Sequence, residues 1–146
     1  MRISRELLDQ LVAHALEDPG NEVCGVVATE AAEPSAAQPA ASEPATEAVR
    51  VLRATNVHRS PLKFEIDPKQ LLELYLAIEA DGHALGAIYH SHVRSRPYPS
   101  QTDINFAANW PGVEWIIVGL AADEQPEVRS YLIEAGEVRE VALEVQ

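Results

Sequence analysis

The sequence predicts one α/β domain in which helices pack against a mixed β-sheet. Its 146 residues are the length of a single domain, and 47% of them are hydrophobic, which is enough for a sizeable core. Helical and strand-like patterns alternate in the first part of the chain, and strand-like patterns dominate the last part. That order of elements is typical of a mixed sheet with helices on its faces, so we treat residues 1–146 as one domain.

The N-terminal part begins with a helix over residues 5–17, because apolar residues recur there at spacings of three and four. Ser4 is its expected N-cap, and a Pro-Gly pair at 19–20 ends it. A short apolar run at 23–28 predicts a buried strand. Residues 31–48 are rich in Ala and Pro and lack Leu, Ile, Val and aromatic side chains, so we expect a flexible surface loop there.

The middle of the chain predicts two strands and a second helix. The strands cover 48–57 and 62–66 and are joined by a turn near Ser60. The helix begins with Asp67 as N-cap, has Pro at its first position, and uses Gln70 to complete a capping box. An Asp-Gly pair at 81–82 ends it, and its apolar stripe comprises Leu71, Leu72, Leu74, Tyr75 and Ile78.

The C-terminal part is dominated by strands. We predict a strand at 84–92, a helix at 100–109 and a further strand at 113–121. Two last strands, at 128–134 and 137–145, form a hairpin through an Ala-Gly turn.

The charge balance excludes two classes of partner. Lys and Arg number 11 and Asp and Glu number 23, which gives a net charge of −12. Nucleic-acid binding needs clustered cations, and an anionic membrane surface repels an acidic protein. The chain also has no apolar run long enough to span a bilayer and no signal-peptide pattern. Because the single cysteine, Cys24, excludes an internal disulfide, we expect a cytoplasmic protein.

The chemistry is concentrated in His90-Ser91-His92, followed by Ser100 and Asp103. Side chains alternate along a strand, so the two imidazoles point the same way and can converge on one ion. Two prolines make the following segment a loop, and Asp103 lies one helical turn beyond Ser100. Two neutral nitrogens and a carboxylate suit Zn²⁺ and leave the fourth position for water, which is typical of a catalytic site.

Each of these residues also has an interpretation without chemistry. Ser100 and Asp103 match the capping box that begins a helix, and the two roles are compatible. The other three histidines, His14, His58 and His83, are expected on the surface or in the core. Cys24 offers a rival enzyme class, a cysteine nucleophile, although its apolar surroundings favour a buried structural thiol.

The joint pattern H-S-H-x7-S-x2-D resembles the JAMM (MPN+) metalloprotease motif. That family adds an upstream glutamate, and Glu22 matches its position. The resemblance implies a single MPN/JAMM domain with a curved mixed sheet between helices, a cytidine-deaminase-like architecture. It also implies one catalytic zinc ion and hydrolysis of peptide or isopeptide bonds beside ubiquitin-like C-termini.

The short length and the segment Glu-Val-Cys-Gly look closest to bacterial stand-alone members, which include a hydrolase of sulfur-carrier proteins. The resemblance implies that the chain releases cysteine from the C-terminal Gly-Gly of such a carrier. In that reading Glu22 moves the proton and Ser100 donates to the developing oxyanion. The alternatives are trimming of the carrier's C-terminal tail, an isopeptidase that removes ubiquitin-like modifiers from lysines, and a non-catalytic MPN scaffold.

Two further expectations concern the substrate and the assembly. Arg94 and Arg96 lie between the ligand segments, and one of them is a candidate for binding the adduct's carboxylate or the glycine tail. The predicted metal ligands, His90, His92 and Asp103, also accept Fe²⁺ or Mn²⁺. A homodimer is compatible with a domain of this size.

Overall fold

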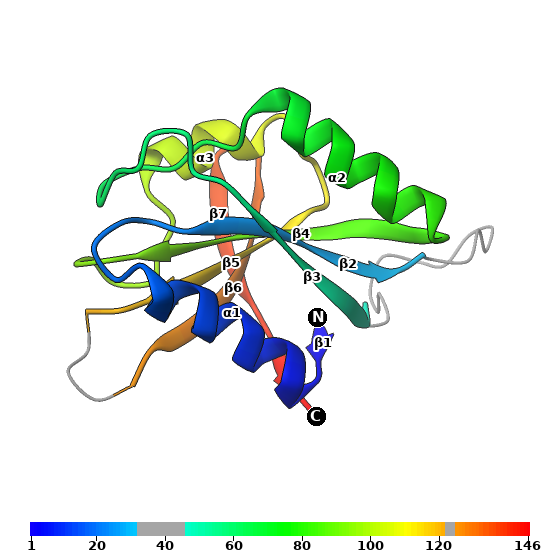
Figure 1. The fold of residues 1–146 in the computed structure, drawn as a ribbon, viewed down its shortest axis with the longest axis horizontal. Coiled ribbons are helices and arrows are strands. Elements are labelled where there is room, and N and C mark those ends of the chain that lie inside the picture. Colours follow the sequence, from blue (N-terminus) through cyan, green and yellow to red (C-terminus); the bar gives the residue numbers. More distant parts are fainter. Residues whose placement is uncertain (32–45, 122–124) are drawn as a thin grey trace.

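The computed structural model describes residues 1–31, 46–121 and 125–146 and shows a mixed sheet between helices (Figure 1). Its elements in chain order are β1 (Arg2–Ile3), α1 (Arg5–Glu17), β2 (Cys24–Glu30), β3 (Ala48–Ala54), α2 (Pro68–Ala80), β4 (His83–His92), α3 (Gln101–Ala107), β5 (Glu114–Gly119), β6 (Glu127–Glu134), β7 (Glu137–Val141) and β8 (Glu144–Val145).

The main sheet has six strands in the order β3-β2-β4-β5-β6-β7. β4 and β5 run parallel, and the other neighbouring strands run antiparallel. The parallel pair needs a crossover connection, which the segment containing α3 provides. The predicted mixed sheet is therefore confirmed.

The helices cover opposite faces of the sheet and define two core layers. In Figure 1, α1 lies on one side of the sheet, and α2 and α3 lie on the other. Leu8 and Leu11 of α1 pack in the same layer as Tyr89, whereas Ile78 of α2 packs in the same layer as Ile88. Neighbouring residues of β4 therefore face different layers, as a pleated strand requires.

The helix predictions are largely confirmed at their starts. Ser4 caps α1 by accepting from the Leu7 N–H at 3.2 Å, and the Asp67 side chain caps α2 by accepting from the Lys69 N–H at 2.8 Å. The capping box at Gln70 was wrong, because its Oε1 accepts from the backbone N–H of Thr55 at 3.0 Å. The predicted stripe of α2 is confirmed for Ile78, which is buried, and for Leu71 and Leu74, which pack against the same core, whereas Leu72 is exposed.

The predicted strand at 62–66 was wrong as well. This segment makes only an isolated bridge, between Asn56 and Ile66, and otherwise runs as an irregular loop. The N–H of Glu65 bonds to the side chain of Asn56 at 3.1 Å, so this backbone group is satisfied by an amide rather than by a neighbouring strand. Apolar composition alone did not distinguish this loop, in which Phe64 and Ile66 are buried and Leu62 is exposed, from a strand.

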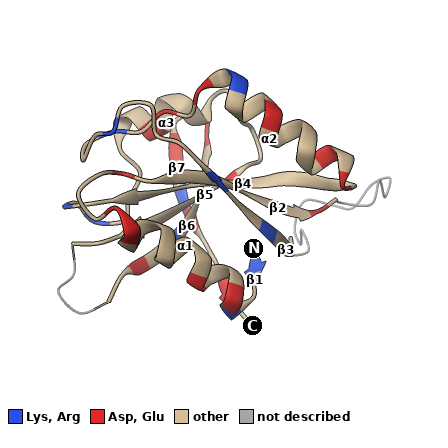
Figure 2. Ribbon diagram, in the orientation of Figure 1, with Lys and Arg blue, Asp and Glu red and all other residues tan. Residues whose placement is uncertain are grey.

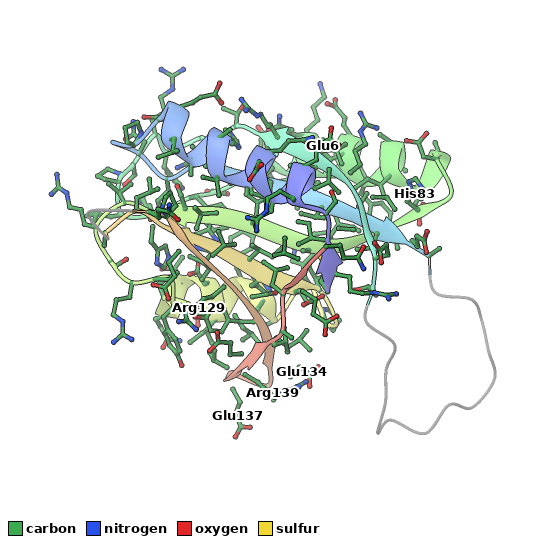
Figure 3. The ribbon with its side chains drawn as sticks, turned by 90° about the horizontal axis from the view of Figure 1, so that it is seen from below. Glu6, His83, Arg129, Glu134, Glu137 and Arg139 are labelled. Atoms are coloured by element: carbon green, nitrogen blue, oxygen red, sulfur yellow. The ribbon has the colours of Figure 1, made fainter. Side chains whose placement is uncertain are left out.

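The C-terminal hairpin is confirmed, with positive φ at Ala135 (52°) and Gly136 (78°) in its turn. Its labelled charged side chains, Glu134, Glu137 and Arg139, gather at the tip (Figure 3). The predicted strand at 137–145 is divided into β7 and β8, and β8 pairs in parallel with the unpredicted β1. The expected flexible loop falls mostly on residues 32–45, outside the described residues.

Acidic side chains are spread over α1 and α2, as the composition predicts (Figure 2). Within the described part of the chain, no helix combines the length and the apolarity needed to cross a membrane.

Candidate metal and catalytic site

His90 and His92 end β4 on the face covered by α2 and α3. Both side chains are buried, with 0% and 5% of their residue surface exposed. Their Nε2 atoms lie 3.1 Å apart, so the alternation of the strand brings them together as predicted. Ser91 points to the opposite face, where its Oγ accepts from the backbone N–H of Val23 at 2.9 Å.

Asp103 reaches the two imidazoles from the first turn of α3. Its Oδ2 atom lies 3.1 Å from Nε2 of His90 and 3.5 Å from Nε2 of His92. The same oxygen accepts from the Ser100 N–H at 2.8 Å, and the Ser100 Oγ accepts from the Asp103 N–H at 3.2 Å. Helix capping and convergence on the histidines therefore coexist in one residue.

These three atoms fit a zinc ion in spacing and in chemistry. Zinc bonds to nitrogen and oxygen of about 2.0–2.2 Å at tetrahedral angles place neighbouring ligand atoms roughly 3.3 Å apart. The observed separations of 3.1, 3.1 and 3.5 Å lie close to that value. The set also combines two imidazoles with one carboxylate, which is a known ligand combination of catalytic zinc.

The ring of His92 is oriented by the loop that follows β4. Its Nδ1 lies 2.8 Å from the carbonyl oxygen of Arg96, so Nδ1 carries the proton and Nε2 is left with its lone pair. Pro97 packs against Gly119 so closely that a Cβ built on Gly119 would lie 2.8 Å from the Pro97 Cδ. The Tyr131 hydroxyl donates to the Pro97 carbonyl oxygen. No local pattern in the sequence pointed to these supporting contacts.

His90 is held by packing instead. Its ring stacks on Phe64, with centroids 4.4 Å apart, and meets Trp115 edge to face at 6.4 Å. Among the described residues its Nδ1 has no hydrogen-bond partner.

Glu22 approaches the histidines from the residues just before β2. One carboxylate oxygen of Glu22 and one nitrogen from each of His90 and His92 lie within 4.8 Å of one another. The side chain is buried, and this burial raises the pKa of Glu22 to about 7. Among smaller effects, the charge of His92 lowers that pKa and the charge of Asp103 raises it. A carboxyl whose pKa lies near neutrality is suited to accept and return a proton.

The backbone of Glu22 is fixed by the buried amide of Asn56, a contact that no sequence pattern predicted. Asn56 donates through Nδ2 to the carbonyl oxygens of Glu22 and Lys63, both at 3.0 Å. Its Oδ1 accepts from the N–H groups of His58 and Glu65, both at 3.1 Å. Asn56 thus ties the Glu22 segment to the loop that carries Phe64.

The charges of the central residues depend on one another. Burial opposes ionisation of Asp103, but His90 and His92 and the Ser100 N–H hold the pKa of that carboxyl well below its usual range. Burial lowers the pKa of His90, which favours the neutral imidazole that a metal needs. The pKa of His92 is raised despite burial, because Asp103 and the Arg96 carbonyl stabilise its protonated form.

Of the two remaining predicted residues, Arg96 contacts this centre through its backbone carbonyl oxygen. Arg94 and Arg96 are exposed, and Arg96 borders a cavity of about 510 Å³ that is also lined by Tyr98 and Arg129. Arg129, labelled in Figure 3, pairs with Glu140 at 2.6 Å. This cavity is lined neither by Glu22 nor by the histidines.

The other histidines and the cysteine have structural surroundings. His14 hydrogen-bonds the buried Tyr89 hydroxyl at 2.7 Å, and His58 pairs with Glu65 at 2.8 Å. His83 begins β4, at the end remote from His92. Cys24 is fully buried, and burial, together with the nearby Glu22 charge, raises the pKa of its thiol to about 12.

Comparison with known proteins places these features in a family. Residues 4–134 match the family described as prokaryotic homologs of the JAB domain. The chain is 32% identical to the CysO-cysteine peptidase of Mycobacterium tuberculosis, over 98% of this chain and 89% of that protein. It is 35% identical to a probable TtuB-protein conjugate cleaving protease of Thermus thermophilus, over 98% and 81%. It is 32% identical to a desampylase of Haloferax volcanii, over 80% and 78%.

Solved structures share the fold. A protein from Desulfitobacterium hafniense superposes with a TM-score of 0.79 at 23% identity, over 99% of this chain and 92% of that chain. A JAB1/MPN domain protein from Archaeoglobus fulgidus superposes with a TM-score of 0.57 at 20% identity, over 99% and 98%. The predicted fold class is confirmed by these neighbours and by the sheet itself.

Proposed function

The chain belongs to the prokaryotic JAB family and is a peptidase of the JAMM/MPN type, and from this premise we propose that it hydrolyses the bond after the C-terminal Gly-Gly of a small ubiquitin-like sulfur-carrier protein. The substrate we favour is a carrier–cysteine adduct, from which free cysteine is released. The observation that carries the proposal is the convergence of His90, His92 and Asp103 with Glu22 alongside.

Zinc is the metal that this site fits best. We assign His90 Nε2, His92 Nε2 and Asp103 Oδ2 as its ligands, because their spacing and chemistry match its tetrahedral preference. When bound, zinc supplies Lewis-acid chemistry, which lowers the pKa of water and polarises a carbonyl group.

Glu22 handles the proton of the reaction. Its carboxylate accepts a proton from the attacking water and then returns it to the nitrogen of the departing amine. The water oxygen first bonds to the glycyl carbonyl carbon, and the carbon–nitrogen bond breaks after the nitrogen has received the proton. The products are the carrier with a free C-terminal carboxylate and an amino acid with a free amine.

Ser100 is placed to stabilise the charge that develops on the carbonyl oxygen. Its Oγ already accepts from the Asp103 N–H at 3.2 Å, so the capping role uses a lone pair and leaves the hydroxyl proton free to donate. The Ser100 residue is exposed at the start of α3, where an extended substrate has access to it.

The relatives bear on the choice of substrate. The name of the Mycobacterium relative, CysO-cysteine peptidase, favours cysteine release, and the TtuB-conjugate protease matches the same 98% of this chain. The relatives named a desampylase and a TtuB-conjugate protease favour the second candidate, an isopeptidase that removes ubiquitin-like modifiers from lysines. A non-catalytic scaffold has no need of the buried carboxyl at Glu22 beside two histidines. We place the reaction in the cytoplasm.

Mass spectrometry tests this function directly. Zinc-loaded protein is incubated with the sulfur carrier bearing one C-terminal cysteine and, separately, with the carrier joined to a lysine side chain. We expect the first substrate to lose one cysteine residue, with Glu22→Gln as the inactive control. Cleavage of the lysine conjugate alone would establish the isopeptidase, and an unchanged mass for both substrates would refute the proposal.

A further inference from the structure

A cavity of about 550 Å³ opens beside Glu22, at the end of the sheet where α1 meets β2 and β3. Its volume lies within the range of about 300–1,000 Å³ that small-ligand pockets have. Glu22 lines it together with two arginines, Arg53 and Arg59, one from β3 and one from the loop that follows.

The position of Glu22 decides what occupies this cavity. The nitrogen that leaves the scissile carbonyl must come within hydrogen-bond distance of the Glu22 carboxyl to receive its proton. Whatever is attached to that nitrogen therefore lies on the Glu22 side of the site. The 550 Å³ cavity is lined by Glu22 but not by His90 or His92, so it lies beyond Glu22 as seen from the histidines, and we infer that it receives the leaving group.

The two arginines of the cavity differ in their availability. Arg53 forms an ion pair with Glu17, so its charge is already matched. Arg59 is exposed and has no ion-pair partner within the described ranges of the chain. The cavity also contains the carboxylate of Asp18, which likewise has no ion-pair partner among the described residues. Arg59 is therefore the cation that remains to recognise an anionic ligand.

The backbone holds Arg59 next to Glu22. The Glu22 N–H donates to the Ser60 carbonyl oxygen at 2.8 Å, and the Arg59 N–H donates to the Asn56 carbonyl oxygen at 3.3 Å. Arg59 has a φ of 45°, a left-handed conformation that is uncommon for a residue other than Gly, Asn or Asp. Residues held in this conformation are enriched at active sites and ligand-binding segments.

We propose that this cavity is the leaving-group subsite and that Arg59 binds the free α-carboxylate of the departing amino acid. The proposal rests on the proposed function and narrows it, because a lysine within a folded protein has no free α-carboxylate beside its amine. A guanidinium fork pairs with a carboxylate through two parallel hydrogen bonds, which makes Arg suited to this recognition.

The test compares two carriers that differ only in the leaving group. One ends in Gly-Gly-cysteine with a free carboxylate, and the other ends in the corresponding cysteine amide. For zinc-loaded wild type we expect kcat/KM for the acid to exceed that for the amide by about 10- to 100-fold, the range of a hydrogen bond to a charged group. Arg59→Asn removes the guanidinium and tolerates positive φ, and it should reduce this preference to less than about threefold.

Matched controls separate Arg59 from the other candidate cations. Arg59→Lys should keep part of the preference, because it retains the charge without the fork. Arg94→Ala and Arg96→Ala should keep the full preference for the acid over the amide, since neither residue lines this cavity. Calorimetry with zinc-loaded Glu22→Gln gives the same comparison as binding constants, without turnover.

The outcomes distinguish the two proposals. Equal cleavage of acid and amide by wild type would overturn the subsite while leaving the function intact. If the preference for the acid survives Arg59→Asn but disappears in Arg94→Ala or Arg96→Ala, the substrate carboxylate is bound by the loop after β4 and not by Arg59. Cleavage of neither carrier, with no binding of either, would overturn both.

Discussion

The carboxylate of Asp103 accepts the backbone N–H of Ser100 through the same oxygen atom that faces the Nε2 atoms of His90 and His92. The first turn of α3 therefore fixes the direction of that oxygen before any metal binds. Helix capping and metal binding depend on different properties of the side chain, so substitutions can separate them.

Asp103→Asn should remove zinc while largely preserving the helix. The amide oxygen still accepts from the Ser100 N–H, but the negative charge is lost. We expect activity to fall by more than the roughly 10–100-fold that follows loss of an outer hydrogen-bond partner of a metal ligand. Elemental analysis gives the zinc content, and thermal unfolding without metal gives the stability of the fold. Asp103→Ala is the control that loses the helix cap as well as the metal ligand. Stoichiometric zinc in Asp103→Asn would contradict the ligand assignment.

Glu22→Gln should bind zinc normally and lose turnover. Its amide has nearly the same shape as the carboxyl but cannot accept and return the proton, a role worth about 10²–10⁴ in rate. The backbone bonds to Ser60 and Asn56 remain available. Zinc content and single-turnover rates provide the check, and a rate close to that of wild type would remove Glu22 from the mechanism.

Ser100→Ala should retain zinc and react about 10²–10³ times more slowly, the effect of losing one donor to an oxyanion. The substitution also removes an N-cap, which by itself costs about 1 kcal/mol. Ser100→Gly removes the same hydroxyl but weakens the cap by only a few tenths of a kcal/mol. Equal rates in the two variants, despite different melting temperatures, would assign the effect to the hydroxyl. A rate that follows stability would assign it to the helix.

Gly119→Ala should weaken zinc binding from a distance. The new Cβ would lie 2.8 Å from the Pro97 Cδ and push the loop whose Arg96 carbonyl orients His92. We expect a loss of about 10–100-fold in zinc affinity, as for other outer-sphere partners. Gly20→Ala is the matched control, because a Cβ there meets no atom within 4 Å. Competition with a metal indicator gives the affinities, and identical values for both variants would dismiss the loop as a support.

Chelation, and not thiol alkylation, should abolish activity. Burial, reinforced by the charge of Glu22, raises the pKa of Cys24 to about 12, so very little thiolate exists at pH 8. We expect slow modification of the native protein by iodoacetamide, rapid modification after unfolding, and near-wild-type turnover in Cys24→Ala. Fast alkylation of the native protein with parallel loss of activity would revive the cysteine-nucleophile hypothesis.

The part of the site that follows local rules was predictable from sequence. His90 and His92 share a face because strands alternate, and Asp103 lies one turn from its cap because helices have that pitch. Glu22 required the family resemblance, because its approach to the histidines depends on long-range packing. Asn56 and the Arg96 carbonyl were not predictable, since a lone amide and a backbone oxygen have no sequence signature.

The wrong predictions about the fold also arose from contacts between residues that are not neighbours in the sequence. Residues 62–66 have the composition of a strand, but Asn56 satisfies the Glu65 N–H of this segment and holds it as a loop. Gln70 has the right position for a capping box, yet the nearby Thr55 N–H competes successfully for its oxygen. In each case a hydrogen bond between residues nine or more positions apart replaced the expected local partner.

The four hydrogen bonds of Asn56 join two segments that border the active centre, the residues around Glu22 and the loop around Phe64. Both segments are hydrogen-bonded to the same amide, so a shift of one strains or breaks the hydrogen bonds that hold the other. Local unfolding around Asn56 would therefore free both Glu22 and Phe64, whose ring stacks on His90, in the same event. Substitutions in either segment are therefore expected to be epistatic, even though the two segments are far apart in the chain.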